Sequence, residues 1–578
     1  MTGTAATITN LYAQFPTLVG AGRYGAQQIQ NVVATLQTRT PVYYVNDPEY
    51  GAVGNGSSNP ASTRYASLGA LQAFYGTTVG GVTIALTNEL DWLAHQKAID
   101  IATAAGGAII SSSAFSYVMC NSNSVADGSG TLLFPPCSHF TPGNAVSWIG
   151  ENEGGTNVSW PVDLGTGRFG VLCNTRATLS SVGEFSNLVL AGPGVGSTLN
   201  ASTCNMQGIG TSDRRAINKM TVGGFNYGIN IVGGQFLWSD VNVVGCFYGI
   251  YWDNPSTVNY GNMVFIRVVS ETCKKAAVGV NASAIIGAGC KFIGGAFAES
   301  PYGIFLEITG GSSPTVLFMQ DVCFDQVQFE GFGNAAVGDA NATLAARTCF
   351  LAKVKFTQCQ FSWQSANKIA ALPAGAIIDV GVLDSVEIDQ VQSVGGFVPG
   401  SSALINALST TTGNNGGLRM TGDIYSIIAN CVAAAGGASV NQFITNPFGN
   451  IRFLDFNGWE GGLCYNSDTT AVVGSVVTQT ASQFGVVMVI VGVILDCPLG
   501  VLMYNPTPGT ANSCCIYADK GTVTVKSSGT TLGKWLRTAA AGASVPATNS
   551  ADVTTPMIGY GTTTVSGGTC TVKLKGLS

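Results

Sequence analysis

Apolar positions recur in short rows along residues 220–393. Each row begins with an apolar residue and carries a second anchor five residues later, with glycine or polar residues between them. Successive rows begin 21, 24, 27, 32, 32 and 32 residues apart. A period of about 20 to 50 residues is typical of solenoids, propellers and other repeat architectures. The rows begin at Met220, Val241, Phe265, Phe292, Phe324, Phe356 and Ile388.

The composition of the rows selects among these architectures. Each row is a short run of β-branched or aromatic residues broken by Gly, Asn or Ser, and none contains a helix-length amphipathic pattern. A single rung of this kind cannot bury its apolar face, so neighbouring rungs must stack. We therefore expect an all-β coil of short parallel strands over residues 176–400. Because the inward strands must stay in register, the longer later rows predict longer outward loops.

One amphipathic helix is predicted before the coil, over residues 88–105. Asn88 is the candidate N-cap, with Asp91 three residues after it. Gly106 and Gly107 end the helix, and the Ala-Ile-Ile that follows is predicted to be a strand. The expected apolar stripe of this helix consists of Leu90, Leu93, Ala94, Ala98, Ile101 and Ala105.

The order of motifs at this point resembles a known family. Tyr50-Gly-Ala-Val-Gly-Asn-Gly56, a capped helix, Ala-Ala-Gly-Gly and a strand are similar to the lead-in of pectate-lyase-superfamily right-handed β-helices, in particular of bacteriophage tailspikes. The run Leu188-Val-Leu-Ala-Gly-Pro-Gly-Val-Gly-Ser-Thr-Leu199 is similar to the glycine-rich turn of that family. The resemblance covers about residues 41–400 and implies a right-handed parallel β-helix capped by the helix. The family's aspartate-rich stretch is replaced here by Asn55-Gly-Ser-Ser-Asn59, so no functional residue is carried over.

Changes of composition divide the rest of the chain. Residues 1–40 form a separate docking or trimer-contact segment, with a helix expected over residues 22–38. Residues 41–175 form the lead-in, whose aperiodic second part is expected to be a large loop excursion. Transition strands are expected over residues 401–470, and a compact antiparallel β-domain, a barrel or a sandwich, over residues 471–578.

The charge of the chain bears on its partners. Charged residues make up only 10% of the chain, and the net charge is −6. Ordinary proteins contain about a quarter, so this low share indicates that other subunits cover much of the surface. Lys and Arg are interspersed, so nucleic-acid binding is not expected. The tailspike resemblance implies a homotrimer that contacts other tail or baseplate proteins through residues 1–40.

The 16 cysteines contain no C-x-x-C pair, and His95 and His139 are the only histidines. We therefore expect mostly reduced core cysteines, a protein made in a cytoplasm, and no metal site. Gly192, Gly194 and Gly196 have G-x-G-x-G spacing with no helix after them, so no cofactor is expected. The chain's beginning lacks the features of a signal peptide. Its most apolar run, residues 484–495, is too short to span a bilayer and is predicted to form buried strands.

Two activities of the superfamily are disfavoured by missing motifs. The polygalacturonase branch uses Gly-His-Gly and Asp-Asp segments, and neither is present. Pectate lyases bind calcium through clustered aspartates and use an arginine base, and no such cluster lies near Arg267. Neither histidine lies in the repeats, so a Ser-His-Asp triad is poorly supported.

Three glutamates recur near the ends of successive rungs and are the candidate catalytic residues. Glu271 and Glu330 lie six residues after their row starts, and Glu299 lies seven after. Adjacent rungs are ~4.8 Å apart, so stacked carboxylates would be separated by ~5 or ~10 Å. These separations bracket those of retaining and inverting glycosidases, and stacking would raise one pKa. The aromatic residues that flank this column, predicted to hold sugar faces, are Tyr248, Tyr302, Phe332 and Trp363.

Other interpretations of these residues stay open. Glu299 is one residue out of phase, so it can point to the other face of its strand. Surface acids are usually solvated or paired with lysines such as Lys274 and Lys275. Trp148 and Trp160, in the expected loop excursion, either pack within the loop or stack on sugars. A second set of acids, which also suits turn chemistry, consists of Asp321, Asp325, Asp379, Asp384 and Asp389.

Two functions follow from these observations. The resemblance implies a tailspike of the virion tail, assembled in the host cytoplasm, that binds a bacterial surface polysaccharide. Paired carboxylates would cleave this polysaccharide, by hydrolysis or by elimination. The alternative is a structural or adhesive virion fibre of the same fold without turnover. Neither function is expected to involve a cofactor, a nucleic acid or insertion into a membrane.

Overall fold

The computed structural model of the protein divides into two compact units. Unit 1 comprises residues 1–164, 168–191 and 213–220, and unit 2 comprises residues 165–167, 192–212 and 221–578. The helix predicted over residues 22–38 lies outside the described part of the chain. The structure describes residues 41–135, 146–152, 154–173, 183–211, 215–231, 237–253, 263–281, 289–307, 316–339, 349–363, 376–393, 405–410, 418–422, 444–445, 452–456, 459–466, 474–483, 486–491, 498–504, 513–526, 535–538, 544–546, 557–561 and 569–575.

The predicted helix of unit 1 is present as α5 (Leu90–Ala104). Its N-cap is Glu89 and not Asn88, because the helix starts from the extended backbone of Glu89 (φ −68°, ψ 133°). The side chain of Asn88 instead closes the preceding turn, where it accepts a backbone N–H at 2.6 Å. The apolar stripe also differs from the prediction, since Ile101 is 38% exposed. Buried apolar residues of α5 that the stripe did not include are Trp92, Ile99 and Ala102.

The described strands between residues 108 and 191 form rungs of a parallel coil in unit 1. Strands pair in parallel with the strand one rung further on, as in β4–β7–β10 and β5–β8–β10. Trp148 and Trp160 are fully buried. The expected loop excursion therefore contributes strands, and its two tryptophans pack inside the coil. The parallel strands of unit 1 are β1 (Val42–Tyr44), β4 (Ala108–Ser112), β5 (Ser116–Val118), β6 (Leu132–Phe134), β7 (Val146–Gly150), β8 (Asn157–Ser159), β9 (Phe169–Cys173) and β10 (Glu184–Ala191). Its short elements are η1 (Ala61–Thr63), α4 (Leu68–Tyr75), β2 (Thr78–Val79), β3 (Val82–Thr83) and α6 (Ser124–Asp127).

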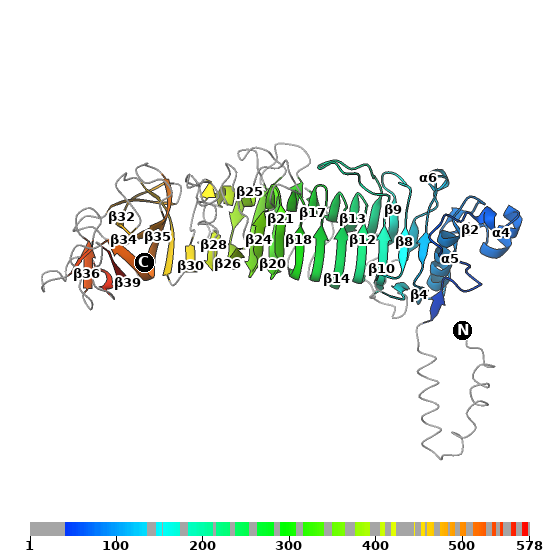
Figure 1. The fold of residues 1–578 in the computed structure, drawn as a ribbon, viewed down its shortest axis with the longest axis horizontal. Helices are drawn as coiled ribbons and strands as arrows, with labels where there is room; N and C mark the ends of the chain where they lie inside the picture. The colour runs from blue at the N-terminus through cyan, green and yellow to red at the C-terminus, as the bar shows by residue number, and fades with distance from the viewer. Residues whose placement is uncertain are drawn as a thin grey trace, which may run out of the picture. The chain divides into compact units, whose positions relative to one another are not determined.

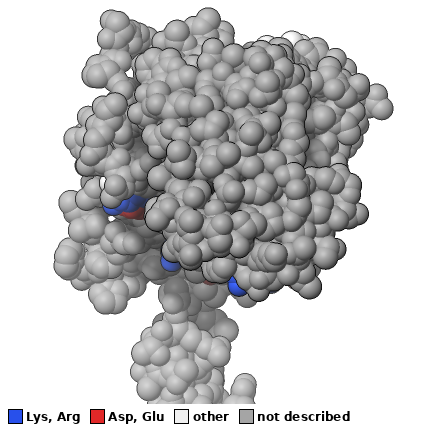
Figure 2. Space-filling view, turned by 90° about the vertical axis from the view of Figure 1, so that its left-hand side faces the viewer, with Lys and Arg blue, Asp and Glu red and all other residues white. Residues whose placement is uncertain are grey.

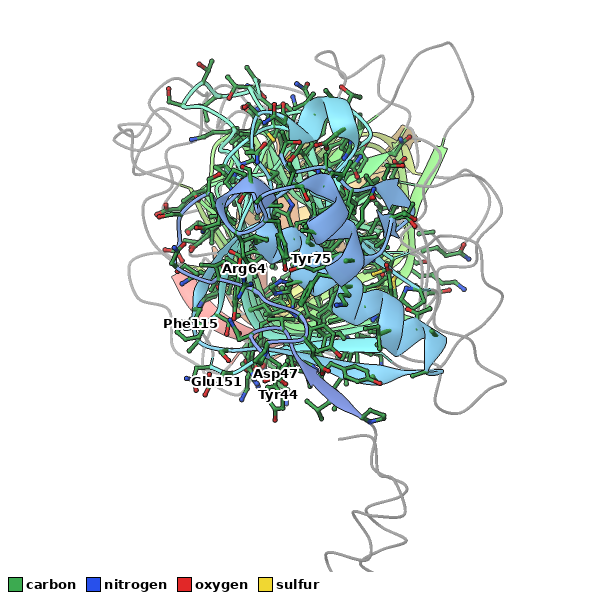
Figure 3. The ribbon with its side chains drawn as sticks, turned by 90° about the vertical axis from the view of Figure 1, so that its right-hand side faces the viewer. Tyr44, Asp47, Arg64, Tyr75, Phe115 and Glu151 are labelled. Atoms are coloured by element: carbon green, nitrogen blue, oxygen red, sulfur yellow. The ribbon has the colours of Figure 1, made fainter. Side chains whose placement is uncertain are left out.

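The lead-in motif that begins at Tyr50 is held by two side chains from the segment that follows it. The Arg64 guanidinium donates to the Gly51 carbonyl at 2.9 Å, and the Tyr75 hydroxyl donates to the Tyr50 carbonyl at 2.7 Å. Figure 3 shows Arg64 and Tyr75 lying close together. Gly51 has φ +82°, a left-handed conformation that favours glycine. The motif is therefore a fixed turn of the scaffold.

Up to residue 456, the described strands of unit 2 form a parallel β-helix. Its strands stack so that each pairs in parallel with the equivalent strand of the next rung, as β14, β18 and β20 show in Figure 1. The predicted coil of parallel strands is thus confirmed. The strands of the coil are β11 (Gln207–Thr211), β12 (Ala216–Gly223, shared with unit 1), β13 (Tyr227–Ile231), β14 (Leu237–Val244), β15 (Tyr248–Trp252), β16 (Val264–Glu271), β17 (Ala276–Asn281), β18 (Cys290–Ala298), β19 (Tyr302–Glu307), β20 (Val316–Asp325), β21 (Gln328–Phe332), β22 (Ala335–Asp339), β23 (Cys349–Thr357), β24 (Gln360–Trp363), β25 (Ala376–Asp384) and β26 (Val386–Ser393).

One inward column of side chains runs through the predicted row starts. Phe265, Phe292, Phe324 and Phe356 are paired in register from rung to rung. Their rings stack with centroids 4.4, 4.9 and 5.0 Å apart. This column confirms the central prediction that residues about thirty positions apart lie on top of each other.

The row that starts at Val241 is three residues out of register. Trp238, and not Val241, pairs with Phe265. Both strands carry a left-handed residue two positions after the inward aromatic residue, at Asp240 (φ +55°) and Arg267 (φ +51°). This residue interrupts the alternation of side chains between the two faces of the strand. The apolar run that begins at Val241 therefore follows the interruption and belongs to the second half of its rung.

The coil continues beyond residue 400. Its last strands keep parallel pairing through β28 and β30, and β30 then pairs antiparallel with β31. The antiparallel domain therefore begins near Trp459, before the predicted boundary at 471. The last strands of the coil are β27 (Ile405–Thr410), β28 (Leu418–Gly422), β29 (Ile444–Thr445) and β30 (Arg452–Phe456).

The C-terminal strands form a mainly antiparallel sheet. An ion pair between Lys520 and Glu460, at 2.9 Å, joins two of its strands. Figure 2 shows only a few described charged side chains on the face that it views. The strands are β31 (Trp459–Asn466), β32 (Val476–Gln483), β33 (Val486–Val491), β34 (Pro498–Tyr504), β35 (Ser513–Lys526), β36 (Trp535–Thr538), β37 (Ser544–Pro546), β38 (Met557–Gly561) and β39 (Thr569–Lys575).

Eight cysteines are free of disulfide bonds, as predicted for most of the cysteines; they are Cys120, Cys173, Cys204, Cys246, Cys273, Cys290, Cys323 and Cys359. Burial raises the pKa of Cys273 to about 11 and that of Cys359 to about 12, so these thiols stay protonated and inert at neutral pH. Among the described helices, none has the length and apolar character needed to cross a bilayer.

Candidate functional site

The three predicted glutamates do not form one column. Glu271 pairs with Ala298, which pairs with Glu330, so these two glutamates lie two rungs apart on one line. Two rungs correspond to ~10 Å. Glu299 follows Ala298 in a left-handed turn conformation (φ +48°), and its N–H donates to the Glu330 carbonyl at 2.8 Å. Glu299 lies seven residues after its row start, one more than Glu271 and Glu330, because it occupies the turn that follows the column position.

Phe332 lies inside the coil. It is 1% exposed and follows Gly331, whose φ is +64°. Residues that follow the equivalent left-handed turn in earlier rungs, Cys246 and Cys273, are also buried. The left-handed turn thus sends the next side chain inward, and the predicted sugar-stacking role of Phe332 is not supported. Trp363 pairs with Phe332 through the backbone, and its side chain lies outside the described part.

A second repeat, which the row analysis missed, organises the region around the predicted Tyr248 and Tyr302. Each copy has the pattern Tyr-Gly-Ile or Ala-Ala-Val, and the first residues of the copies pair in register. Its middle position must be small: a Cβ on Gly249 would lie 1.9 Å from the Ser270 hydroxyl oxygen. The copies begin at Tyr227, Tyr248, Ala276, Tyr302 and Ala335.

The aromatic residues of this repeat lie on the outer face of the coil. Trp252 points inward, because its ring contacts the Phe265 ring at 5.7 Å. The neighbouring Tyr251 points to the opposite face, where the rings of Tyr248 and Tyr251 both cover Gly279 of the next rung. Tyr227 stacks on Tyr251 with centroids 4.2 Å apart and an interplanar angle of 2°, and Tyr248 lies 5.0 Å from Tyr251. We call the set the outer aromatic cluster; Tyr248, Tyr251 and Phe305 are its buried members, and Tyr227, Phe247 and Tyr302 are partly buried against them.

Glycines on the neighbouring rungs make room for these rings. A Cβ on Gly279 would lie 2.6 Å from the Tyr248 ring and 2.7 Å from the Tyr251 ring. A Cβ on Gly338 would lie 2.8 Å from the Tyr302 ring. The rings therefore lie flat over the next rung, and Tyr251 reaches a partner two rungs away.

That partner belongs to a polar rim along the cluster. The Tyr251 hydroxyl donates to the Glu307 carboxylate at 2.8 Å. Asn281 pairs with Glu307 in register, and its side-chain amide donates to the Asp253 carboxylate at 3.1 Å. The Lys275 ammonium lies 4.3 Å from the centre of the Phe305 ring. The rim thus offers two carboxylates, an amide and an ammonium beside aromatic rings.

The protonation of the cluster follows from its burial. Burial, and then the charge of Glu307, raises the pKa of Tyr251 far above its ordinary value. Tyr251 therefore stays protonated and acts as a hydrogen-bond donor. Burial lowers the pKa of Lys275, and the nearby Glu307 opposes this effect.

Two of the predicted aromatic residues thus belong to the outer aromatic cluster, while the carboxylates beside them are not the predicted ones. Tyr248 is 3% exposed and forms the base of the cluster, whereas Tyr302 is half-buried at its edge. Sequence reasoning missed Tyr251, Asp253 and Glu307, although the recurring Tyr-Gly-Ile string marks their strands. No group of three or more metal-binding side chains occurs among the described residues.

The fold resembles that of several solved structures. The tailspike protein gp49 from Pseudomonas phage LKA1 has 11% identity and a TM-score of 0.36, over 83% of this chain and 96% of that chain. DFA-IIIase from Arthrobacter chlorophenolicus A6 has 9% identity and a TM-score of 0.38, over 66% and 83%. PfbA, a surface adhesin of Streptococcus pneumoniae, has 12% identity and a TM-score of 0.36, over 72% and 91%. Similarities this low do not assign an activity.

No sequence-family profile and no curated protein matches the chain. The fold class therefore rests on the pairing of the strands themselves.

Proposed function

We propose that the protein is a tailspike or tail fibre of a virion that binds a bacterial surface polysaccharide through the outer aromatic cluster. The observation that carries this proposal is the pair of half-buried rings of Tyr227 and Tyr302, packed on buried tyrosines beside Asp253, Asn281 and Glu307. Aromatic faces pack on the apolar faces of sugar rings, and carboxylate and amide groups bond to sugar hydroxyls. The lead-in resemblance supports the placement on a phage tail.

Tail attachment, a homotrimer and assembly in the host cytoplasm are also part of this proposal. Residues 1–40 are proposed to attach the chain to other tail or baseplate proteins. The low share of charged residues, 10%, supports a homotrimer whose subunits cover part of each coil. Assembly in the host cytoplasm fits the free, buried cysteines.

Replacing Tyr302 or Tyr227 with alanine is expected to weaken polysaccharide binding about tenfold, because each removes a half-buried ring at the edge of the cluster. Binding would be measured by biolayer interferometry against a panel of immobilised capsular polysaccharides and O-antigens. Tyr44→Ala is the matched control, since Tyr44 is 48% exposed and lies in unit 1, outside the cluster. Equal affinities of all three variants and the unaltered protein would remove the cluster from the binding site.

Cleavage of the bound polysaccharide is the second candidate function. It is favoured by the shared column of Glu271 and Glu330, whose ~10 Å strand separation approaches the ~6.5–9.5 Å between carboxyl groups of inverting glycosidases. Glu299 stays in the proposal as the third carboxylate, next to this column. An adhesive fibre without turnover is the alternative.

The roles of the three glutamates can be distinguished by substitution, because Glu271 and Glu330 share the column and Glu299 lies beside it. If the column cleaves, Glu271→Gln and Glu330→Gln should each lower the rate at least about a hundredfold, since each removes a proton-transfer group. Glu299→Gln should have a much smaller effect because Glu299 lies outside the column. Release of reducing ends from the bound polysaccharide measures the rate. Full activity in all three variants excludes these glutamates.

A further inference from the structure

We propose that the outer aromatic cluster and its rim recognise a positively charged amino group on the glycan, such as the free amine of an amino sugar. This inference rests on the proposed binding of a polysaccharide at the cluster, and it specifies the chemical class of that polysaccharide. Three features of unit 2 support it.

The first feature is a cation of the chain itself that lies on the cluster. The Lys275 ammonium lies 4.3 Å from the centre of the Phe305 ring and 5.7 Å from that of Tyr302. The negative face of an aromatic ring attracts a cation at such distances, and recognition of ammonium groups by several rings is a known use of this attraction. The cluster thus already accommodates one ammonium group.

The second feature is the position of the two carboxylates. The Glu307 carboxylate accepts the Tyr251 hydroxyl at 2.8 Å, and Asn281, which pairs with Glu307, donates to the Asp253 carboxylate at 3.1 Å. Tyr227 stacks on Tyr251 and is itself half-buried. A half-buried ring that stacks on the partner of Glu307 can bind an ammonium group through its π face, with the two carboxylates supplying the opposite charge.

The third feature is the poor fit of an acidic sugar. Its carboxylate would approach Asp253, Glu307 and the negative faces of the rings, all of which repel it. Lys275 is the only cation that the structure records against the rings of the cluster in the described part of unit 2. A neutral sugar is tolerated, but it gains nothing from the two carboxylates.

Three pentasaccharides test the inference on the full chain by isothermal titration calorimetry at low salt and slightly acid pH. They are fully deacetylated chitosan pentamer, which is cationic, N-acetylchitopentaose, which is neutral, and pentagalacturonate, which is anionic. The cationic pentamer is expected to bind about tenfold more tightly than the neutral one, and the anionic one least. Added salt should reduce this preference. Equal or tighter binding of the neutral or the anionic pentamer overturns the inference.

Variants that change the charge of the rim test whether the site prefers a cationic or an anionic ligand. Glu307→Gln and Asp253→Asn should each reduce the preference for the cationic pentamer severalfold, whereas Lys275→Gln should increase affinity for it. Asp47→Asn, in unit 1, is the matched control. The reverse signs, with Lys275→Gln weakening binding, would mean that the cluster takes an anionic ligand.

The two proposals fail in different ways. If the protein binds neither the pentamers nor any member of the polysaccharide panel, the proposed function itself is wrong. If it binds a panel polysaccharide but not the cationic pentamer, the polysaccharide site stands and the amino-group inference is overturned.

Discussion

Replacing Asp91 with alanine is expected to destabilise unit 1 by about 3–5 kcal/mol. The Asp91 carboxylate is 1% exposed and accepts three backbone N–H groups, from Val53 at 2.6 Å and from Gly54 and Val118 at 3.0 Å. Alanine leaves all three donors without their acceptor, and at ~1–3 kcal/mol for each buried unpaired group the sum is large. Asp91→Asn keeps one oxygen that can accept a hydrogen bond, so it should lose less stability than Asp91→Ala.

Hydrogen–deuterium exchange measures this effect at the amides concerned. Protection of residues 53, 54 and 118 should fall at least about a hundredfold in Asp91→Ala. Asp100 provides a matched control on the same helix, because its exposed carboxylate accepts the Gly80 N–H at 2.8 Å in contact with solvent. Asp100→Ala should change protection by less than about 1 kcal/mol. Unchanged protection in Asp91→Ala would show that the lead-in is held by other contacts.

The role of Asp91 illustrates what a helix pattern can predict. The spacing from Asn88 to Asp91 suggested a capping pair at the helix start. The helix is present, but Asp91 is on its buried side and binds the lead-in motif that begins at Tyr50. Local spacing predicts that a helix forms, whereas the partners of a buried carboxylate come from strands that only the tertiary fold brings near.

The stacked fold was predictable because the inward positions carry large apolar side chains. Phe292, Phe324 and Phe356 recur at nearly constant spacing, and this spacing is the length of one rung. The register of Val241 was not predictable in the same way. A left-handed residue such as Asp240 ends the alternation within a strand, and although Asp favours that conformation, the equivalent Arg267 carries no such preference.

The candidate site was predictable only in part for a related reason. The shared column of Glu271 and Glu330 follows from equal spacing within their rungs. Phe332 was misplaced because a turn at Gly331 reverses the side to which the next residue points. The outer aromatic cluster depends on Gly279, whose lack of a side chain makes room for two rings from the preceding rung.

Small residues inside the coil and aromatic residues outside it are linked. Gly249 lies where the walls of the coil approach closely, so no side chain fits inside at that point. Its neighbours Tyr248 and Tyr251 are each only 3% exposed and form the buried base of the cluster, whereas Tyr227 and Tyr302 at its edge are half-buried. The narrow point of the coil thus fixes the place at which these aromatic rings pack together.

The second prediction of large effect concerns pH. His95 of α5 is fully buried, and burial lowers its pKa to about 4. Its Nδ1–H donates to the Asp91 carbonyl at 2.8 Å, and its Nε2 accepts from the Ser112 hydroxyl at 3.0 Å, so both ring nitrogens are satisfied in the neutral form. Protonation would turn a second N–H toward Ser112, whose oxygen already accepts the Trp148 indole N–H at 2.8 Å.

In the unfolded chain His95 titrates near its ordinary pKa of 6.5, and in the folded chain near 4. The unfolded state therefore binds the extra proton between these values, so stability is complete above pH 6.5 and is lost as the pH falls toward 4. The difference corresponds to about 3 kcal/mol. Urea titrations at pH 7.0 and 4.5, read by exchange in residues 90–118, should show this loss in the unaltered protein but not in His95→Gln. Comparing the two proteins cancels the contribution of nearby carboxyl groups, including Asp91, whose pKa burial raises. An equal loss in both would mean that His95 is protonated in the folded state.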